Sequence, residues 1–170
     1  LNVASDGPEA DPLVILLHVV PEFWYGWHAQ NPTLAAAGLR VLAPDLRGYN
    51  LSDKPRGISA YRADRVAADI VGLIDDAARE RATIVGHDWG GAIAWTVAMR
   101  HAERVSQLVV LNCGHPAAML RRIATDPRQL MRSWYIFALQ LPWLPERLAR
   151  ANDFRMLVRA LRGSSRRGTF

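Results

Sequence analysis

Short apolar runs alternate with stretches of helical periodicity through the first two thirds of the chain. The run Leu13–Leu17 is apolar throughout, which is typical of a strand buried on both faces of a parallel sheet. Similar short runs predict further strands at 41–43, 82–86 and 105–111. Apolar positions at helical spacing predict intervening helices over 27–38, 61–78 and 92–99. Strands that alternate with helices indicate an α/β protein with a mostly parallel sheet and right-handed crossovers.

The pattern changes after Pro116. Asp126 followed by Pro127 predicts the start of a helix, with a capping residue and a proline in the first turn, and this helix continues through 134–137. Pro145 and the residue after it open a second helix, which we expect to run to about residue 161, before a polar, turn-like end over 163–170. We therefore predict two domains, an α/β core over 1–116 and a partial helical cap over 117–170.

Composition places the chain among ordinary globular proteins. Cys113 is the single cysteine of the 170 residues, so no internal disulfide is possible and a reducing compartment fits. The first residues show no basic-then-apolar leader, and the longest aromatic and apolar run, 134–144, is too short to span a bilayer. We expect a cytoplasmic protein that does not bind membranes.

The net charge of +5 comes from arginines concentrated late in the chain. Such an excess could indicate nucleic-acid binding, but no DNA- or RNA-binding motif accompanies it, and acidic residues interrupt it. We interpret it as a solvated helical face rather than a surface for nucleic acid or acidic membranes. The arginines are Arg147, Arg150, Arg155, Arg159, Arg162, Arg166 and Arg167.

The hexapeptide 86–91, Gly-His-Asp-Trp-Gly-Gly, joins a predicted strand to a predicted helix. Its glycines let the chain reverse within a few residues while Asp88 is held in a strained conformation. The pattern is that of a nucleophile elbow, G-x-Nuc-x-G, with Asp in place of the usual Ser. A carboxylate is already ionised at neutral pH and can attack an sp3 carbon directly, forming an alkyl-enzyme ester. The alternative is that Asp88 merely caps the helix; the three glycines at these spacings favour the nucleophile.

Four segments that carry polar or aromatic side chains follow the predicted strands. In a parallel sheet the loops after residues 17, 43, 87 and 111 share the carboxyl edge, where ligands bind. Together these segments resemble the α/β-hydrolase superfamily, and within it the Asp-nucleophile, epoxide hydrolase-like branch that is related to haloalkane dehalogenases. The resemblance runs from about residue 10 to the C-terminus. It is carried by His18 with 21–24 (Pro-Glu-Phe-Trp), 44–49 (Pro-Asp-Leu-Arg-Gly-Tyr) with 52–55 (Ser-Asp-Lys-Pro), the hexapeptide 86–91, and Asn112 with His115 and Pro116.

The resemblance implies roles for particular residues. Asp88 would be the nucleophile, and the backbone N–H groups of Trp89 and Val20 would form an oxyanion hole for hydrolysis of the ester. Tyr135 resembles one of the two cap tyrosines that donate a hydrogen bond to the epoxide oxygen as the ring opens. Phe23, Trp24 and Trp89 would line the substrate pocket. The implied substrate is a small epoxide or a similar apolar electrophile, with no cofactor and no metal, and the oligomeric state stays open.

The chain departs from the family pattern at several positions. Val19 replaces the usual glycine, and a β-branched residue there is strained by about 1–3 kcal/mol if its φ is positive. Val20 is not the asparagine that haloalkane dehalogenases use to hold halide, and Trp89 is not the arginine of fluoroacetate-type dehalogenases. These substitutions favour epoxide opening over dehalogenation.

In this fold the acid and the histidine of the catalytic triad follow the nucleophile. No acid follows the strand at 105–111, and each of the five histidines is better explained structurally. Of these, His87 should point away from Asp88 because side chains alternate along a strand. We therefore expect a fragment, truncated at both ends, that has the nucleophile but lacks the water-activating base. Two alternatives stay open: a haloalkane dehalogenase-like hydrolase, and a non-catalytic remnant or interaction module.

Overall fold

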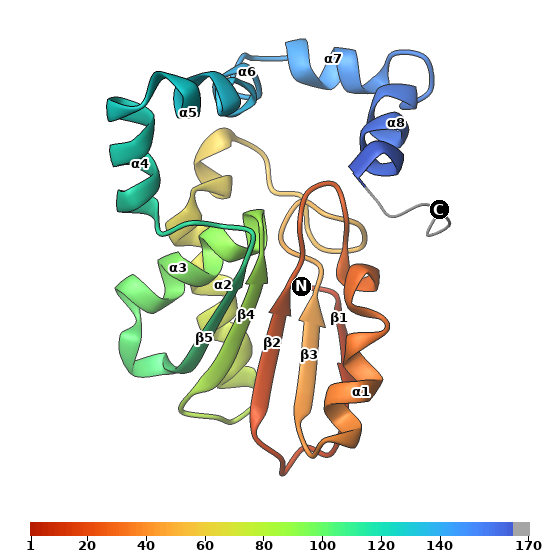
Figure 1. Ribbon diagram of the computed structural model, residues 1–170. Coiled ribbons are helices and arrows are strands. Elements are labelled where there is room, and N and C mark those ends of the chain that lie inside the picture. Colours follow the sequence, from red (N-terminus) through yellow and green to blue (C-terminus); the bar gives the residue numbers. More distant parts are fainter. Residues whose placement is uncertain (165–170) are drawn as a thin grey trace. The chain divides into compact units, whose positions relative to one another are not determined.

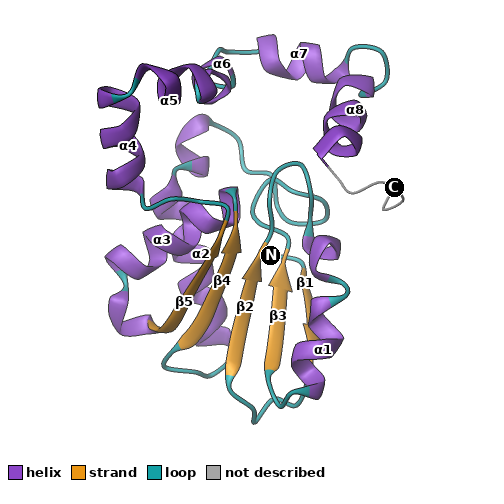
Figure 2. Ribbon diagram, viewed as in Figure 1, coloured by secondary structure: helices purple, strands orange, loops and turns teal. Residues whose placement is uncertain are grey.

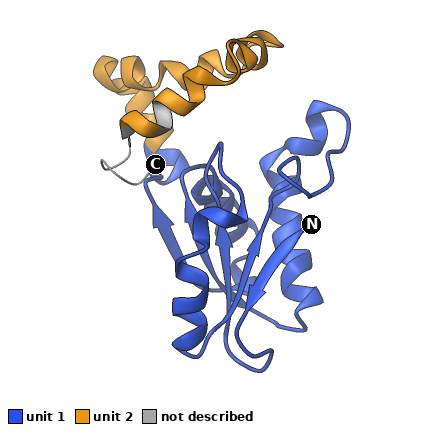
Figure 3. Ribbon diagram, turned by 90° about the vertical axis from the view of Figure 1, so that its right-hand side faces the viewer, with its two compact units in different colours: residues 1–118 blue, residues 119–170 orange. Residues whose placement is uncertain are grey.

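The computed structural model describes residues 1–164, which form part of two compact units, Leu1–Ala118 and Met119–Phe170. Figure 3 shows the two units in different colours. The first unit contains a sheet with helices on both of its faces (Figures 1 and 2). As far as residue 164, the regular elements of the second unit are helices.

The sheet has five strands in the order β1-β3-β2-β4-β5. Neighbouring strands are parallel except that β1 runs antiparallel to β3 at one edge. The predicted parallel sheet is therefore confirmed, while β1 is an addition that the sequence pattern did not predict. The strands are β1 (Val3–Asp6), β2 (Leu13–Leu17), β3 (Arg40–Pro44), β4 (Ala82–His87) and β5 (Val105–Leu111).

The helices of the first unit follow the predicted order with shifted ends. The predicted helix over 27–38 is instead a 3-10 turn, η1, followed by a short helix, α1, and Gly38 ends it at a φ of 81°. The predicted helix over 61–78 is confirmed as α2. The elements are η1 (Trp24–Trp27), α1 (Gln30–Ala36), η2 (Ile58–Tyr61), α2 (Ala63–Asp76), α3 (Trp89–Arg100) and η3 (Ala102–Arg104).

Strand β2 is buried on both faces, as its apolar run predicts. Ile15 and its alternate neighbours pack with Ile70 of α2 and Ile93 of α3 in one core cluster. Val14 and Leu16 pack with Trp27 and Val41 in a second cluster. Because successive side chains of a strand point to opposite faces, the sheet separates two cores, and its central strands are held rigidly from both sides.

The second unit consists of short helices. Asp126 caps α5 by accepting a hydrogen bond from the N–H of Arg128 at 3.0 Å, as predicted. The two long helices predicted for this region are wrong: the chain forms several short ones. They are α4 (Pro116–Thr125), which begins in the first unit, α5 (Pro127–Arg132), α6 (Trp134–Ala138), α7 (Leu144–Arg150) and α8 (Arg155–Ser164).

Left-handed backbone explains the breaks. Trp143 has a φ of 53° just before α7, and residues 152–154 have φ values between 53° and 58°, which ends the helix predicted to reach residue 161. Gly163 lies inside α8 rather than in a turn, and residues 165–170 lie outside the described residues. The interpretation of 117–170 as part of a cap stays a prediction.

The late arginines that the structure describes are exposed on or beside α7 and α8, as a solvated face requires. Arg166 and Arg167 lie outside the described residues. Among the helices of residues 1–164, none combines the length and apolar character needed to cross a membrane.

Candidate active site

Asp88 occupies a sharp turn between β4 and α3. Its backbone has φ 51° and ψ −110°, a region that non-glycine residues rarely adopt and that costs about 1–3 kcal/mol. The N–H of Asp88 donates to the carbonyl of Leu111 at 3.0 Å, and its carbonyl accepts from the N–H of Ala92 at 3.0 Å. The strained conformation is therefore held by bonds to β5 on one side and to α3 on the other.

The carboxylate of Asp88 does not cap the helix that follows it. Asp88 is the residue at the N-cap of α3, but its side chain makes no capping hydrogen bond. Within residues 1–164 it has no salt bridge and no side-chain hydrogen bond to the protein. The capping interpretation of Asp88 is therefore wrong, and the partly exposed carboxylate is available for chemistry.

Close backbone packing explains the glycines around Asp88. A Cβ on Gly86 would lie 2.3 Å from the carbonyl oxygen of Gly90. A Cβ on Gly90 would lie 2.3 Å from the carbonyl oxygen of Leu17, at the end of β2. Both neighbours are backbone atoms that cannot move aside, so the turn requires glycine at these positions.

The loop after β2 carries the predicted oxyanion donor. The N–H of Val20 donates to no other described residue, and the peptide bond between Val20 and Pro21 is cis. The N–H of Trp89 begins α3 and has no intrahelical acceptor. Val19 is not among the residues with positive φ, so the strain expected at this position is absent. The pairing of these two N–H groups at one substrate oxygen stays a prediction.

The predicted pocket residues Phe23 and Trp24 lie at the end of the same loop, whereas Tyr135, predicted as a proton donor, lies in the second unit. Phe23 is exposed and Trp24 is half-buried, and their rings meet edge to face with centroids 6.4 Å apart. Tyr135 lies in α6 of the second unit, with its side chain 47% exposed. Its role as a proton donor stays a prediction.

Two residues near Asp88 were not predicted as part of the site. Burial raises the pKa of the Tyr49 hydroxyl, and the negative charge of Asp88 raises it further. Burial and the same charge also raise the pKa of the Cys113 thiol. Both groups therefore stay protonated at neutral pH beside the carboxylate. In the sequence, only their positions could have placed them at the site, because Tyr49 and Cys113 follow the carboxyl ends of β3 and β5.

Each histidine has a local partner. His18 is bonded to Val19 and Leu46, and His28 stacks on Tyr25 and contacts its carbonyl oxygen. The remaining three also have a nearby partner. His87 accepts a hydrogen bond from the Asn112 amide at 3.1 Å, and His115 accepts one from the N–H of Ala117. Nδ1 of His101 lies 3.9 Å from a carboxylate oxygen of Glu103. These contacts agree with the structural interpretation of the histidines.

Asp88 lines neither of two hollows in the first unit. The larger, of about 600 Å³, is lined by residues between Arg47 and Arg65, so it does not mark the candidate site. The smaller, of about 380 Å³, is lined by residues at the ends of β2, β4 and β5, including Glu22, His87 and Asn112. His87 lines this hollow and Asp88 does not; that the two side chains point apart stays a prediction. Among the described residues, no group of His, Cys, Asp and Glu is arranged to hold a metal ion.

The fold and this site define an α/β protein with a strained acidic residue at a strand–helix turn. Residues 12–157 match the family described as alpha/beta hydrolase fold, and the chain belongs to that family. The predicted fold class, a partial α/β-hydrolase sheet flanked by helices, is confirmed.

Curated relatives agree with this assignment. The chain is 48% identical over 170 residues to the AB hydrolase superfamily protein YfhM of Bacillus subtilis, covering all of this chain and 59% of that protein. It is 41% identical over 169 residues to Epoxide hydrolase A of Mycobacterium tuberculosis, covering 96% of this chain and 51% of that protein. The chain thus spans about half the length of the curated relatives that it matches.

A solved structure is also similar. An epoxide hydrolase from Bacillus megaterium superposes with a TM-score of 0.86 at 33% identity, covering 94% of this chain and 55% of that chain. The resemblance to the epoxide hydrolase-like branch is therefore confirmed.

Proposed function

We propose that the protein opens epoxides through Asp88. A carboxylate oxygen of Asp88 attacks an epoxide carbon, the C–O bond of the ring breaks, and the released alkoxide takes a proton. The product of this step is an alkyl-enzyme ester. The resemblance assigns the proton donation to Tyr135.

The observation that carries this proposal is the strained backbone of Asp88 at the β4–α3 turn, together with a carboxylate that has no partner within residues 1–164. A structural aspartate at this position would cap the helix or form an ion pair, and among those residues Asp88 does neither. The names of the relatives support the reaction class. A related Bacillus megaterium epoxide hydrolase was solved with its product, a naphthyloxy-propane-1,2-diol, which is what hydrolytic opening of an epoxide yields.

The second half-reaction is hydrolysis of the ester to a diol. Water attacks the ester carbonyl, negative charge develops on its oxygen, and the N–H groups of Val20 and Trp89 would stabilise that charge. This step needs a base to activate water. None of the five histidines is assigned that role, so we expect the ester to accumulate on this chain.

Intact-protein mass spectrometry after incubation with styrene oxide tests the proposal. We expect one adduct with the mass of one epoxide, mapped to Asp88 by peptide fragmentation, and no adduct on Asp88→Asn. An adduct that persists on Asp88→Asn would contradict the assignment. Sustained diol production by the wild-type chain would contradict the expected lack of a base. Release of halide from a haloalkane would instead support the dehalogenase alternative.

A further inference from the structure

We propose that Asp45 is a positioning residue for the ester-cleavage step. Its buried carboxylate fixes the loop segment 19–23, which carries the candidate oxyanion donor Val20. This inference rests on the proposed function and adds to it a residue outside the nucleophile and the oxyanion hole. It is carried by the hydrogen bonds that join the loop after β2 to the loop after β3.

Asp45 is fully buried and has no cationic partner among the described residues. Its Oδ1 accepts a hydrogen bond from the backbone N–H of Trp24 at 3.0 Å. Its Oδ2 accepts from the side-chain amides of Asn2 at 2.8 Å and Asn50 at 2.9 Å. A buried carboxylate is stable only when such donors satisfy it, so the three bonds fix its position firmly.

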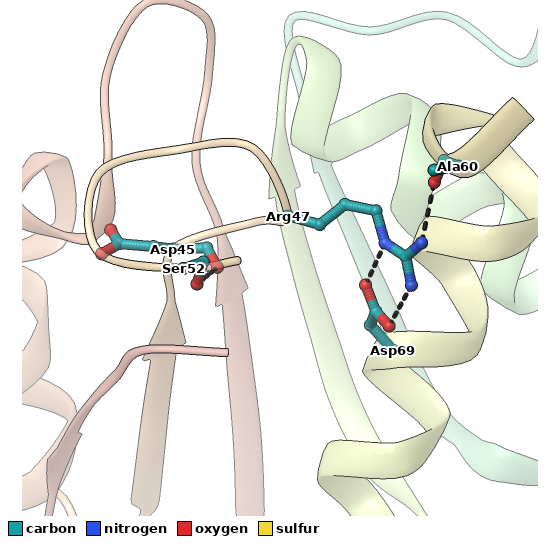
Figure 4. A network of polar contacts seen from close by, with 5 residues as sticks. All are labelled: Asp45, Arg47, Ser52, Ala60 and Asp69. Carbon is teal, nitrogen blue, oxygen red and sulfur yellow. Dashed lines mark hydrogen bonds and ion pairs between the residues drawn. The ribbon is translucent and has the colours of Figure 1, made fainter. Parts of the chain in front are cut away.

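The backbone of Asp45 is fastened as well. Its N–H donates to the carbonyl of Asn2 at 2.9 Å, and its carbonyl accepts from the Ser52 hydroxyl at 2.6 Å. Figure 4 shows Asp45 beside Ser52, while Arg47 extends the other way to Asp69 of α2 and to the carbonyl of Ala60. The loop after β3 is thus a rigid support with two separate polar networks.

The candidate oxyanion loop is attached to this support at both ends. Trp24, at its far end, is held by Asp45. His18, at its near end, accepts a hydrogen bond from the N–H of Leu46 at 3.0 Å. The hydrogen bonds that residues 19–23 themselves make stay within residues 18–26. The position of Val20 therefore depends on two anchors contributed by consecutive residues, Asp45 and Leu46.

The two half-reactions depend differently on this anchor. Alkylation of Asp88 needs the carboxylate and a proton donor, whereas cleavage of the ester develops charge on its carbonyl oxygen and needs the N–H donors. Loss of the Asp45 anchor should therefore slow ester cleavage far more than alkylation. A residue that only supported folding would affect both steps together.

Hydroxylamine supplies a nucleophile that needs no enzymic base. Its nitrogen attacks the ester carbonyl carbon, and the bond between that carbon and the alkoxy oxygen breaks. The diol leaves, and residue 88 becomes a hydroxamate. Mass spectrometry on the styrene oxide adduct follows the loss of adduct and the gain of the hydroxamate. We expect Asp45→Ala to slow this cleavage by at least about tenfold, because a small misplacement of a donor is costly. Asp45→Asn keeps an acceptor for the Trp24 N–H and should restore most of the rate.

A second pair of variants tests the same bond without altering Asp45. Trp24→Pro removes the N–H, and Trp24→Ala removes the same indole but keeps the N–H. Proline is tolerated at this first position of η1 because Phe23 before it is extended, at φ −144° and ψ −172°. We expect Trp24→Pro to cleave its ester at least about tenfold more slowly than Trp24→Ala.

Asp69→Asn serves as the control, because it disrupts the neighbouring Arg47 network and leaves the Trp24 anchor in place. Its cleavage rate should match that of the wild type. The inference is overturned if both Asp45→Ala and Trp24→Pro cleave as fast as their matched variants. Absence of any adduct on the wild-type chain would overturn the proposed function instead, so the two failures are distinct.

Discussion

The backbone N–H of Leu46 donates a hydrogen bond to Nε2 of His18 at 3.0 Å. A backbone N–H can only donate, so Nε2 carries no proton, and Nδ1 is the donor to the carbonyl of Val19 at 3.1 Å. The ring is 1% exposed and meets Tyr49 edge-on, with centroids 4.7 Å apart. His18 is therefore a neutral, buried link between the loops after β2 and β3.

This link should make stability depend on pH. Burial lowers the pKa of His18 below its ordinary value of 6.5, against smaller opposing effects that include the charge of Asp45. The unfolded chain then binds a proton more readily than the folded one, so the stabilisation is complete above about pH 6.5 and is lost as the pH falls towards the folded-state pKa. We expect the free energy of unfolding, measured in urea, to fall by at most about 1.4 kcal/mol per pH unit from this residue.

His18→Gln isolates that contribution. Its amide oxygen can accept from the Leu46 N–H, but the side chain does not titrate. The variant should be less stable at pH 7 and should show a shallower loss of stability between pH 7 and pH 5. An unchanged slope would assign the pH dependence to other groups.

Gly90 and Gly72 allow a matched pair of substitutions to alanine. Gly90→Ala should destabilise the protein by about 3 kcal/mol, because its Cβ would lie 2.3 Å from the Leu17 carbonyl oxygen and 2.8 Å from that of His18. Gly72→Ala, inside α2, meets no atom within 4 Å and should stabilise by about 0.5–1 kcal/mol. Urea unfolding measures both changes, and similar values for the two variants would contradict the close packing at the turn.

Arg47 and Asp69 form a bidentate ion pair, with nitrogen–oxygen distances of 2.6 and 2.5 Å and both side chains about one-fifth exposed. Arg47→Lys cannot reproduce the two parallel bonds, so we expect a loss of about 2 kcal/mol in unfolding free energy. Asp64→Asn, which removes a pair with the exposed Arg62 and a negative charge from the first turn of α2, should destabilise the protein less. Equal effects of the two substitutions would mean that the bidentate geometry contributes little.

The alternation of strands and helices was predictable because burial on both sheet faces leaves continuous apolar runs such as that of β2. Strand β1 was not predictable, since its four residues, Val-Ala-Ser-Asp, show no such run and it is defined by pairing with β3. The short helices of the second unit were also missed. Trp143 and Phe154 adopt left-handed backbone although large side chains rarely do. Asn152 and Asp153 are types that tolerate this conformation, but Asn and Asp occur in helices as well, so they did not mark the break.

The candidate site was predictable only in part. Asp88 could be identified because the tight packing of its turn requires glycines at fixed positions around it, and these glycines form a recognisable sequence pattern. Asp45 could not be identified in this way, because an acid after a strand usually faces solvent. Its burial depends on Asn2, 43 residues earlier, and on the N–H of Trp24, which belongs to another loop. Those contacts arise only when β1, β2 and β3 come together, so no local spacing reveals them.

Tyr135 is the proton donor proposed for opening of the epoxide. If it donates a proton to the opening epoxide, Tyr135→Phe removes the donor and keeps the ring, so the rate of adduct formation on Asp88 should fall by about a hundredfold, the lower end for general-acid catalysis. Tyr61→Phe, in η2, removes a hydroxyl that has no assigned role and should leave the rate unchanged. The adduct mass followed over time measures both rates. Because Tyr135 acts before the ester forms, hydroxylamine should cleave the ester of Tyr135→Phe as fast as that of the wild type; slower cleavage would place the residue in the second half-reaction instead.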